Sequence, residues 1–158
     1  MKLRENMLPV LRPYGGDEEI EALSKVIKSG WWGKGPLVKE FEDKFAKMVG
    51  AKYAVAVSSN SHGQDLVMKA LDIRDGDVIN PTISFMATAM IPLWQPNITT
   101  NIVDVDPHTM NMDVEDVRNS ITPNTKAIIA VNQAGVPAPI DEIREFYDGF
   151  IIEDCAHS

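Results

Sequence analysis

The chain has 158 residues, of which 44% are hydrophobic and 24% are charged, and its formal net charge is −8. This length fits one domain with a sizeable core, while the acidic balance argues against a broad nucleic-acid-binding surface. The single cysteine, Cys155, excludes an intramolecular disulfide and favours a reducing compartment.

Membrane and metal sites are not expected either. The first 14 residues hold no apolar core of the length that a signal peptide needs, and the apolar run at 86–94 is too short to span a bilayer. We therefore expect a soluble, cytoplasmic protein with no membrane partner. The histidines, His62, His108 and His157, are scattered and follow no metal-ligand spacing, so no metal site is predicted.

The first third of the chain predicts two amphipathic helices joined by a glycine-rich loop. Apolar residues recur on one face of 17–28, and Gly30 stands where a helix commonly ends. Residues 29–35 form the loop SGWWGKG, and Pro36 opens the second helix at a position that proline favours. Gly50 is expected to end that helix.

The rest of the chain alternates strand and helix patterns. Short apolar runs predict strands at 53–57, 77–80, 101–105, 126–131 and 150–154. Helices are predicted after residue 63, at 84–91, from an Asp113 cap through Val117, and at 140–147. The alternation is typical of parallel βαβ units, so we predict an α/β fold of three layers, α/β/α, with a mostly parallel sheet.

Ligands of such sheets gather at the carboxyl ends of the strands, here the segments 58–63, 81–85, 132–139 and 154–158. The first segment, SSNSHG, is a polar turn at a helix start, where hydroxyls and N–H groups suit a phosphate. The alternative is an N-cap without a ligand, in which Ser59 or Ser61 satisfies the helix.

Three further side chains at these ends could meet a flat ligand ring. Phe85 could stack on it, or be an ordinary core phenylalanine. Asp154 ends a buried run, so its carboxylate needs a partner: a protonated ring nitrogen, a lysine, or the N–H groups of a following element. His157 could bond a phenolic oxygen beside the ring, or be a loop histidine. A nucleophile pair of Cys155 and His157 is disfavoured because nothing marks an oxyanion hole.

Several short motifs occur in a familiar order. They are Ser29–Pro36 (SGWWGKGP), Gly50–Val57 (GAKYAVAV), Gly76–Ile79 (GDVI), Val103–Pro107 (VDVDP), Ile121–Ile129 (ITPNTKAII) and Ile152–His157 (IEDCAH). With these motifs the chain resembles, from Pro9 to His157, the DegT/DnrJ/EryC1/StrS family of sugar aminotransferases that depend on pyridoxal 5'-phosphate (PLP). The resemblance implies the large PLP-binding domain of fold type I aminotransferases.

By this resemblance the chain is a truncated, N-terminal part of that domain. An arm, helix and loop would occupy 1–35 and the αβ core 36–158, and the small C-terminal domain would be absent. Transfer of an amino group from a donor, expected to be glutamate, to a nucleotide-linked keto sugar is implied, in a homodimer. The Schiff-base lysine would lie beyond Ser158, since no lysine follows Lys126. We therefore expect no catalytic residue within the chain, and no activity from it alone.

The resemblance also assigns the cofactor-binding residues. Asn60 and Ser61 occupy phosphate-binding positions, Phe85 the position that stacks on the pyridine ring, and Asp154 the position that holds the ring nitrogen protonated. His157 occupies the position that reaches the phenolic oxygen. The phosphate turn departs from the family, because Asn60 replaces a glycine and His62 replaces a small residue.

Three other interpretations stay open. A PLP-dependent sugar dehydratase of the same family has a histidine in place of the lysine. A non-catalytic module could bind PLP or a nucleotide at the same strand ends. A partial fold could associate through its exposed sheet edge. The loop with Trp31 and Trp32 could serve the dimer interface or the sugar-nucleotide site, or be a packed corner.

Overall fold

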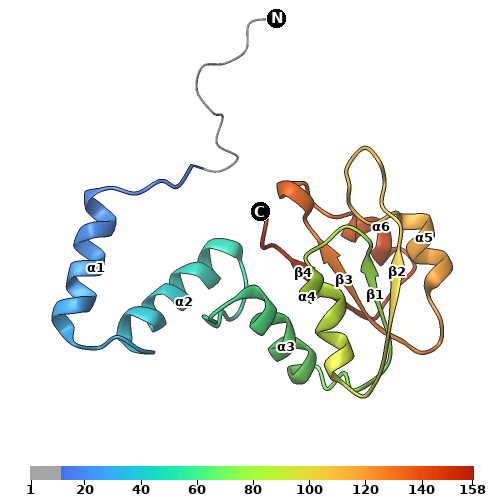
Figure 1. The fold of residues 1–158 in the computed structure, drawn as a ribbon, viewed down its shortest axis with the longest axis horizontal. Helices are drawn as coiled ribbons and strands as arrows, with labels where there is room; N and C mark the ends of the chain where they lie inside the picture. The colour runs from blue at the N-terminus through green and yellow to red at the C-terminus, as the bar shows by residue number, and fades with distance from the viewer. Residues whose placement is uncertain (1–11) are drawn as a thin grey trace, which may run out of the picture. The chain divides into compact units, whose positions relative to one another are not determined.

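The computed structural model describes residues 12–158. Within this range the chain forms two compact units, one that ends at Ala56 and one from Val57 to Ser158 (Figure 1). Of the arm, helix and loop predicted at 1–35, residues 1–11 lie outside the described residues. No helix in the described range is long and apolar enough to cross a membrane.

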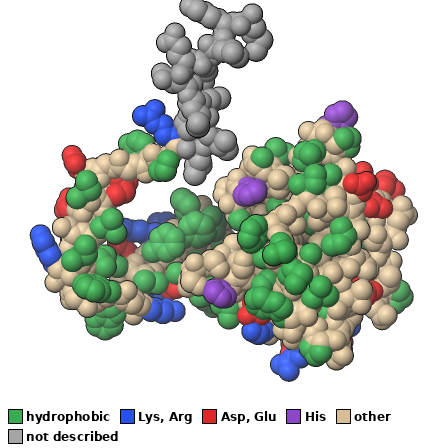
Figure 2. Space-filling model, in the orientation of Figure 1, with side chains coloured by type: hydrophobic (Ala, Val, Ile, Leu, Met, Phe, Trp, Pro, Cys, Tyr) green, Lys and Arg blue, Asp and Glu red, His purple; other side chains and the backbone are tan. Residues whose placement is uncertain are grey.

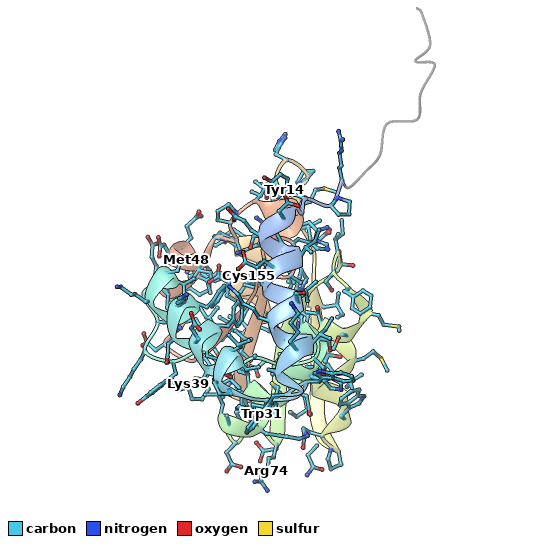
Figure 3. All side chains as sticks on the ribbon, turned by 90° about the vertical axis from the view of Figure 1, so that its left-hand side faces the viewer. Tyr14, Trp31, Lys39, Met48, Arg74 and Cys155 are labelled. Carbon is cyan, nitrogen blue, oxygen red and sulfur yellow. The ribbon has the colours of Figure 1, made fainter. Side chains whose placement is uncertain are left out.

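The first unit contains two helices, α1 (Asp17–Ser29) and α2 (Pro36–Val49), as the sequence predicts. Tyr14 precedes α1 and Trp31 follows it, so they mark its two ends in Figure 3. Each helix ends at a glycine in the left-handed region, Gly30 with φ 68° and Gly50 with φ 71°. That backbone conformation favours glycine, so the sequence signal and the geometry agree.

The apolar face of α1 is exposed in this unit. Ile20, Leu23 and Ile27 are each more than 60% exposed, and no residue of α1 is buried. Hydrophobic side chains also appear at the surface of both units in Figure 2. Helix stability comes mainly from burial of such a face, so packing against the described residues adds little to the stability of α1.

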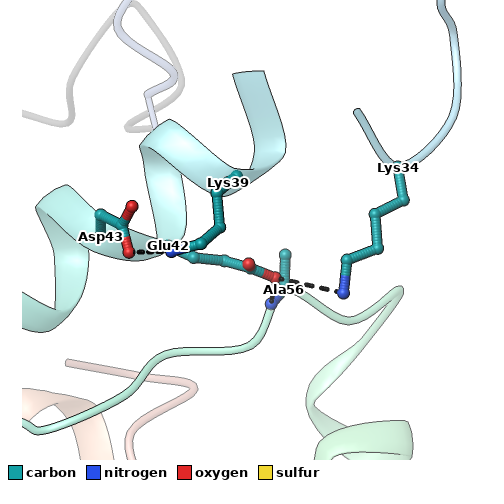
Figure 4. Close-up of polar contacts among 5 residues, drawn as sticks. All are labelled: Lys34, Lys39, Glu42, Asp43 and Ala56. Atoms are coloured by element: carbon teal, nitrogen blue, oxygen red, sulfur yellow. Dashed lines mark hydrogen bonds and ion pairs between the residues drawn. The ribbon is translucent and has the colours of Figure 1, made fainter. Parts of the chain in front are cut away.

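A buried glutamate connects α2 to the segment that follows it (Figure 4). Glu42 is 7% exposed, and its Oε1 accepts a hydrogen bond of 3.0 Å from the Ala56 N–H. Lys34 Nζ lies 3.8 Å from the same oxygen, which gives the carboxylate a charged partner. Lys39 and Asp43 form a separate ion pair on the exposed side of α2.

The strand predicted at 53–57 is wrong. The segment belongs to no described ladder, although its alternating apolar pattern is that of a strand. Tyr53 and Val55 are 76% and 66% exposed, so the apolar side chains find no layer to pack against among residues 12–158. A strand requires a neighbour for its backbone groups, and here the Glu42 side chain takes the Ala56 N–H.

The second unit is built on a four-stranded, all-parallel sheet in the order β2-β1-β3-β4. The strands are β1 (Asp75–Pro81), β2 (Asn97–Val103), β3 (Thr125–Val131) and β4 (Phe150–Asp154). This confirms the predicted α/β class and parallel sheet. β2 begins four residues before its predicted start, because residues 97–101, which are mostly polar, also pair with β1 at the edge of the sheet.

Helices cover both faces of the sheet, which confirms the three layers. They are α3 (Asn60–Ala70), α4 (Met86–Met90), η1 (Pro92–Trp94), α5 (Val114–Ser120), η2 (Gln133–Gly135) and α6 (Ile140–Arg144). The Asp113 side chain caps α5 by accepting from the Asp116 N–H at 2.9 Å, as predicted. α6 is shorter than predicted, and Arg144 donates to the carbonyls of Tyr147 and Gly149 just beyond its end.

Successive residues of β1 and β3 point to opposite faces and build two cores. On one face, Ile79 and Ile128 pack with Val117 of α5 and Ile143 of α6. On the other, the members of the cluster are Met68 of α3, Ile73, Val78, Ile98, Ala127, Ile129 and Ile152. Because both of its faces are buried, the central strand β3 is almost continuously hydrophobic, and this explains why the sequence predicts it.

Tyr147 gives a test of the core that packs against α5 and α6. Its side chain is 7% exposed, its hydroxyl has no partner, and burial raises the pKa of the phenol. We expect Tyr147→Phe to increase the free energy of unfolding by about 1 kcal/mol at pH 7, because an unpaired buried hydroxyl is removed.

The same pKa gives a pH dependence with a definite sign. The folded state holds the phenol proton of Tyr147 more tightly than the unfolded state does. The contribution of this proton to the free energy of unfolding is therefore complete below about pH 10 and is lost above it. Urea unfolding between pH 8 and pH 11 would therefore show a smaller alkaline loss in Tyr147→Phe than in the parent. Tyr14→Phe, at a fully exposed position, is the control and should follow the parent.

Candidate active site

The carboxyl ends of the parallel strands meet α3 and α4 at a cleft of about 270 Å³ in the second unit. Ten residues line it: Asn60, Ser61, Gln64, Phe85, Ala87, Thr88, Val131, Asp154, Ala156 and His157. All five residues that the sequence assigned to a cofactor are among them. The topology brings them together because β1, β3 and β4 run in the same direction and end at the same edge.

The polar turn before α3 forms the N-terminus of that helix. Ser59 is the N-cap residue, and its Oγ accepts from the His62 N–H at 3.3 Å. The His62 Nδ1 lies 2.6 Å from Ser58 Oγ, so the imidazole is held by the turn itself. The N–H groups of Asn60 and Ser61 belong to the first turn, where a helix has no internal acceptors to offer them. The turn is therefore an N-cap and also keeps donors that suit an anion.

Asp154, at the end of β4, has the most constrained side chain of the cleft. It is 4% exposed, and its Oδ1 accepts from Asn60 Nδ2 at 2.7 Å and from the Ala156 N–H at 3.0 Å. Its Oδ2 accepts from Gln64 Nε2 at 2.6 Å. The partners are two amides and one backbone N–H, and none is a lysine. A carboxylate has about four acceptor sites, so one remains, on Oδ2.

Gln64 is the site residue that sequence reasoning missed. It is 3% exposed and lines the cleft, and while Nε2 donates to Asp154, Oε1 has no partner. Thr88, also buried in the lining, has an unpartnered Oγ1. The signal was present: Gln64 lies four residues after Asn60, so both side chains share one face of α3.

Phe85 and His157 lie at the more open part of the lining. Phe85 is 71% exposed, so the interpretation as a core phenylalanine is wrong and one aromatic face is available for stacking. His157 is exposed in the tail after β4. Their contacts with a ring and a phenolic oxygen remain predictions.

The neighbours of Asp154 do not form a second reactive centre. Glu153 points away and accepts from Asn132 Nδ2 at 2.8 Å, as expected for the opposite face of the strand. Partial burial raises the pKa of the Cys155 thiol, which keeps it protonated and weakly nucleophilic. The disfavoured Cys155–His157 pair gains no support from this arrangement.

Comparison with known proteins places the chain in one family. The model of the DegT/DnrJ/EryC1/StrS aminotransferase family matches residues 13–158. The chain belongs to this family. A relative with 40% identity, over 99% of this chain and 41% of its own length, is the uncharacterized protein MJ1066 of Methanocaldococcus jannaschii.

Two solved structures show the same fold. The Escherichia coli GDP-4-keto-6-deoxy-D-mannose-3-dehydratase with bound hydrated PLP has a TM-score of 0.86 at 32% identity, over 93% of this chain and 40% of that chain. The putative sugar aminotransferase Spr1654 from Streptococcus pneumoniae, in its pyridoxamine phosphate (PMP) form, has a TM-score of 0.87 at 25% identity, over 96% of this chain and 43% of that chain. The chain thus spans about two fifths of the length of these relatives.

The described residues fit PLP by their own chemistry. The cleft offers first-turn N–H groups and Ser61 at one wall, an aromatic ring on Phe85, and a fixed carboxylate with one free acceptor site. The unpartnered Oε1 of Gln64 and Oγ1 of Thr88 are polar atoms of the kind that a bound polar ligand or water satisfies.

The N-cap of α3 can be tested independently of any ligand. We expect Ser59→Ala to lower the free energy of unfolding by about 1 kcal/mol, because the His62 N–H loses its acceptor. Ser61→Ala is the matched control and should change it by less than about 0.5 kcal/mol. Urea denaturation of the two variants measures this, and equal losses would mean that Ser59 is not the cap.

Proposed function

We propose that this chain holds PLP for a sugar aminotransferase and forms the N-terminal part of that enzyme's cofactor-binding domain. The reaction is the transfer of an amino group from a donor, glutamate, to a nucleotide-linked keto sugar. The observation that carries the proposal is the buried Asp154 carboxylate, which three donors hold at a cleft beside a helix N-terminus and an exposed aromatic ring.

Each side chain of the cleft then has a definite task. Ser61 and the first-turn N–H groups of α3 bind the phosphate, where the helix dipole favours an anion. Phe85 packs on one face of the ring and excludes water from it. Asp154 accepts from the protonated ring nitrogen through the free site on Oδ2, a charge-assisted hydrogen bond. His157 binds the phenolic oxygen.

Asn60 contributes in two ways. Its backbone N–H belongs to the phosphate turn, as the sequence predicted, while its side-chain amide donates to Asp154. It therefore links the phosphate end of the cleft to the ring-nitrogen end. PLP, when bound, supplies an electron sink for the carbanion that transamination requires, and a protonated ring nitrogen strengthens that sink.

The 158 residues bind the cofactor without turnover in this proposal. The reaction needs a lysine that forms the Schiff base, and the sequence contains no lysine after Lys126. The whole enzyme is proposed to act as a homodimer. A dehydratase that removes a sugar hydroxyl is the second candidate, supported by the dehydratase relative at 32% identity. The residue at the Schiff-base position distinguishes the two candidates: a lysine indicates the aminotransferase and a histidine indicates the dehydratase.

The proposal is tested with PMP, because it needs no lysine to bind. Titration of the chain, followed by the fluorescence of PMP, should give saturable binding that inorganic phosphate weakens by competition. Asp154→Ala should lower the affinity about 10- to 100-fold, which is the range for loss of a hydrogen bond to a charged group. Asp148→Ala, at an exposed position outside the cleft, is the control and should bind as the parent does.

Two results would contradict the proposal. One is the absence of saturable PMP binding by the folded parent chain. The other is measurable amino-group transfer by the 158 residues with glutamate and a nucleotide-linked keto sugar, since that would mean that no external lysine is needed.

A further inference from the structure

We propose that Gln64 is a positioning residue for the ring nitrogen of the cofactor, acting through Asp154. This inference rests on the proposed function, and it adds a residue to which neither the family resemblance nor the sequence patterns assigned a role. It starts from the hydrogen bond of 2.6 Å between Gln64 Nε2 and Asp154 Oδ2.

Burial distinguishes this contact from the others on Asp154. Gln64 and Asp154 are 3% and 4% exposed, whereas Asn60 is exposed at the start of α3. Water cannot readily replace a donor at a buried position, but it can replace one at an exposed position. Gln64 is therefore the side chain that fixes the Asp154 carboxylate whether or not Asn60 contacts it.

The distribution of donors over the two oxygens gives Gln64 its specific effect. Oδ1 already accepts from Asn60 and from the Ala156 N–H, while Oδ2 accepts from Gln64 alone. A pyridinium N–H that binds Asp154 must share Oδ2 with Gln64, because each carboxylate oxygen has about two acceptor sites. Gln64 thus occupies one site of Oδ2 and leaves the other for the ring nitrogen.

The unpaired end of the Gln64 amide supports a role beyond packing. Its Oε1 is buried without a partner, an arrangement that is unfavourable for folding and that an apolar side chain of the same length avoids. Reversal of the amide would bring Oε1 against a carboxylate oxygen, so Nε2 must face Asp154. The donor is kept on Asp154 although the acceptor is left unsatisfied.

The test compares two ligands that differ at one ring atom. They are PMP and its 1-deaza analogue, in which a C–H replaces the ring nitrogen. The ratio of their dissociation constants isolates the contact with Asp154 from phosphate binding and stacking. The parent chain should bind PMP about 10-fold or more tightly than the analogue, as a charge-assisted hydrogen bond requires.

Gln64→Met removes the donor and keeps the length and volume of the side chain. We expect it to reduce the PMP-to-analogue ratio at least about 5-fold while affinity for the analogue stays within about 2-fold of the parent. Gln64→Asn, which keeps an amide that is too short to reach Oδ2, should reduce the ratio in the same way. Gln95→Met is the matched control outside the cleft and should keep the parent ratio.

The outcomes separate the inference from the proposed function. An unchanged ratio in folded Gln64→Met or Gln64→Asn overturns the role of Gln64, and so does an equal loss of affinity for both ligands, which indicates a structural role alone. A parent chain that binds PMP and the analogue equally contradicts the contact between Asp154 and the ring nitrogen, and with it the proposed function. Circular dichroism and urea denaturation establish that each variant is folded.

Discussion

The carboxylate of Asp154 is almost completely buried at the end of an edge strand, and a buried charge persists only where hydrogen bonds compensate its loss of hydration. That requirement connects elements far apart in the sequence. α3 must present Asn60 and Gln64 on one face, and the backbone must turn after β4 so that the Ala156 N–H reaches Oδ1. The same turn brings His157 to the cleft. The geometry of the site is thus a consequence of stabilising one acid.

Much of the secondary structure in both units could be predicted from the sequence, because its signals are local. The hydrophobic runs of β3 and β4, the Asp113 cap and the glycines that end α1 and α2 each act within a few residues. The prediction of a strand at 53–57 was wrong because a strand depends on a signal that is not local. The alternation in this segment describes a strand, but a strand exists only where another strand pairs with it, and no described strand does. Pairing is a property of the tertiary structure, so the pattern at 53–57 could not decide it.

The candidate site also has a part that the sequence predicted and a part that it did not. The rule that ligands gather at strand ends and the family resemblance together found five residues that the fold brings to one cleft. Gln64 was missed although it shares a face of α3 with Asn60, because a glutamine is ordinary on a helix. Its hydrogen bond to Asp154, ninety residues away in sequence, shows that it belongs to the site. The contact of the Asn60 side chain was missed for a related reason. The resemblance assigned this position to phosphate binding, and the family's usual glycine there has no side chain. The asparagine has one, and it donates to Asp154.

The proposed function depends on one contact, in which Asp154 accepts a hydrogen bond from a protonated ring nitrogen in this cleft. The most direct measurement is the ¹⁵N spectrum of PMP labelled at the ring nitrogen and bound to the 158-residue chain. If Asp154 accepts from the ring N–H, the bound ligand will show the chemical shift of a pyridinium nitrogen at a pH where free PMP has lost that proton. The same shift will be absent in Asp154→Ala. A bound ligand with the shift of a neutral pyridine in the parent chain would mean that Asp154 does not hold the ring nitrogen protonated.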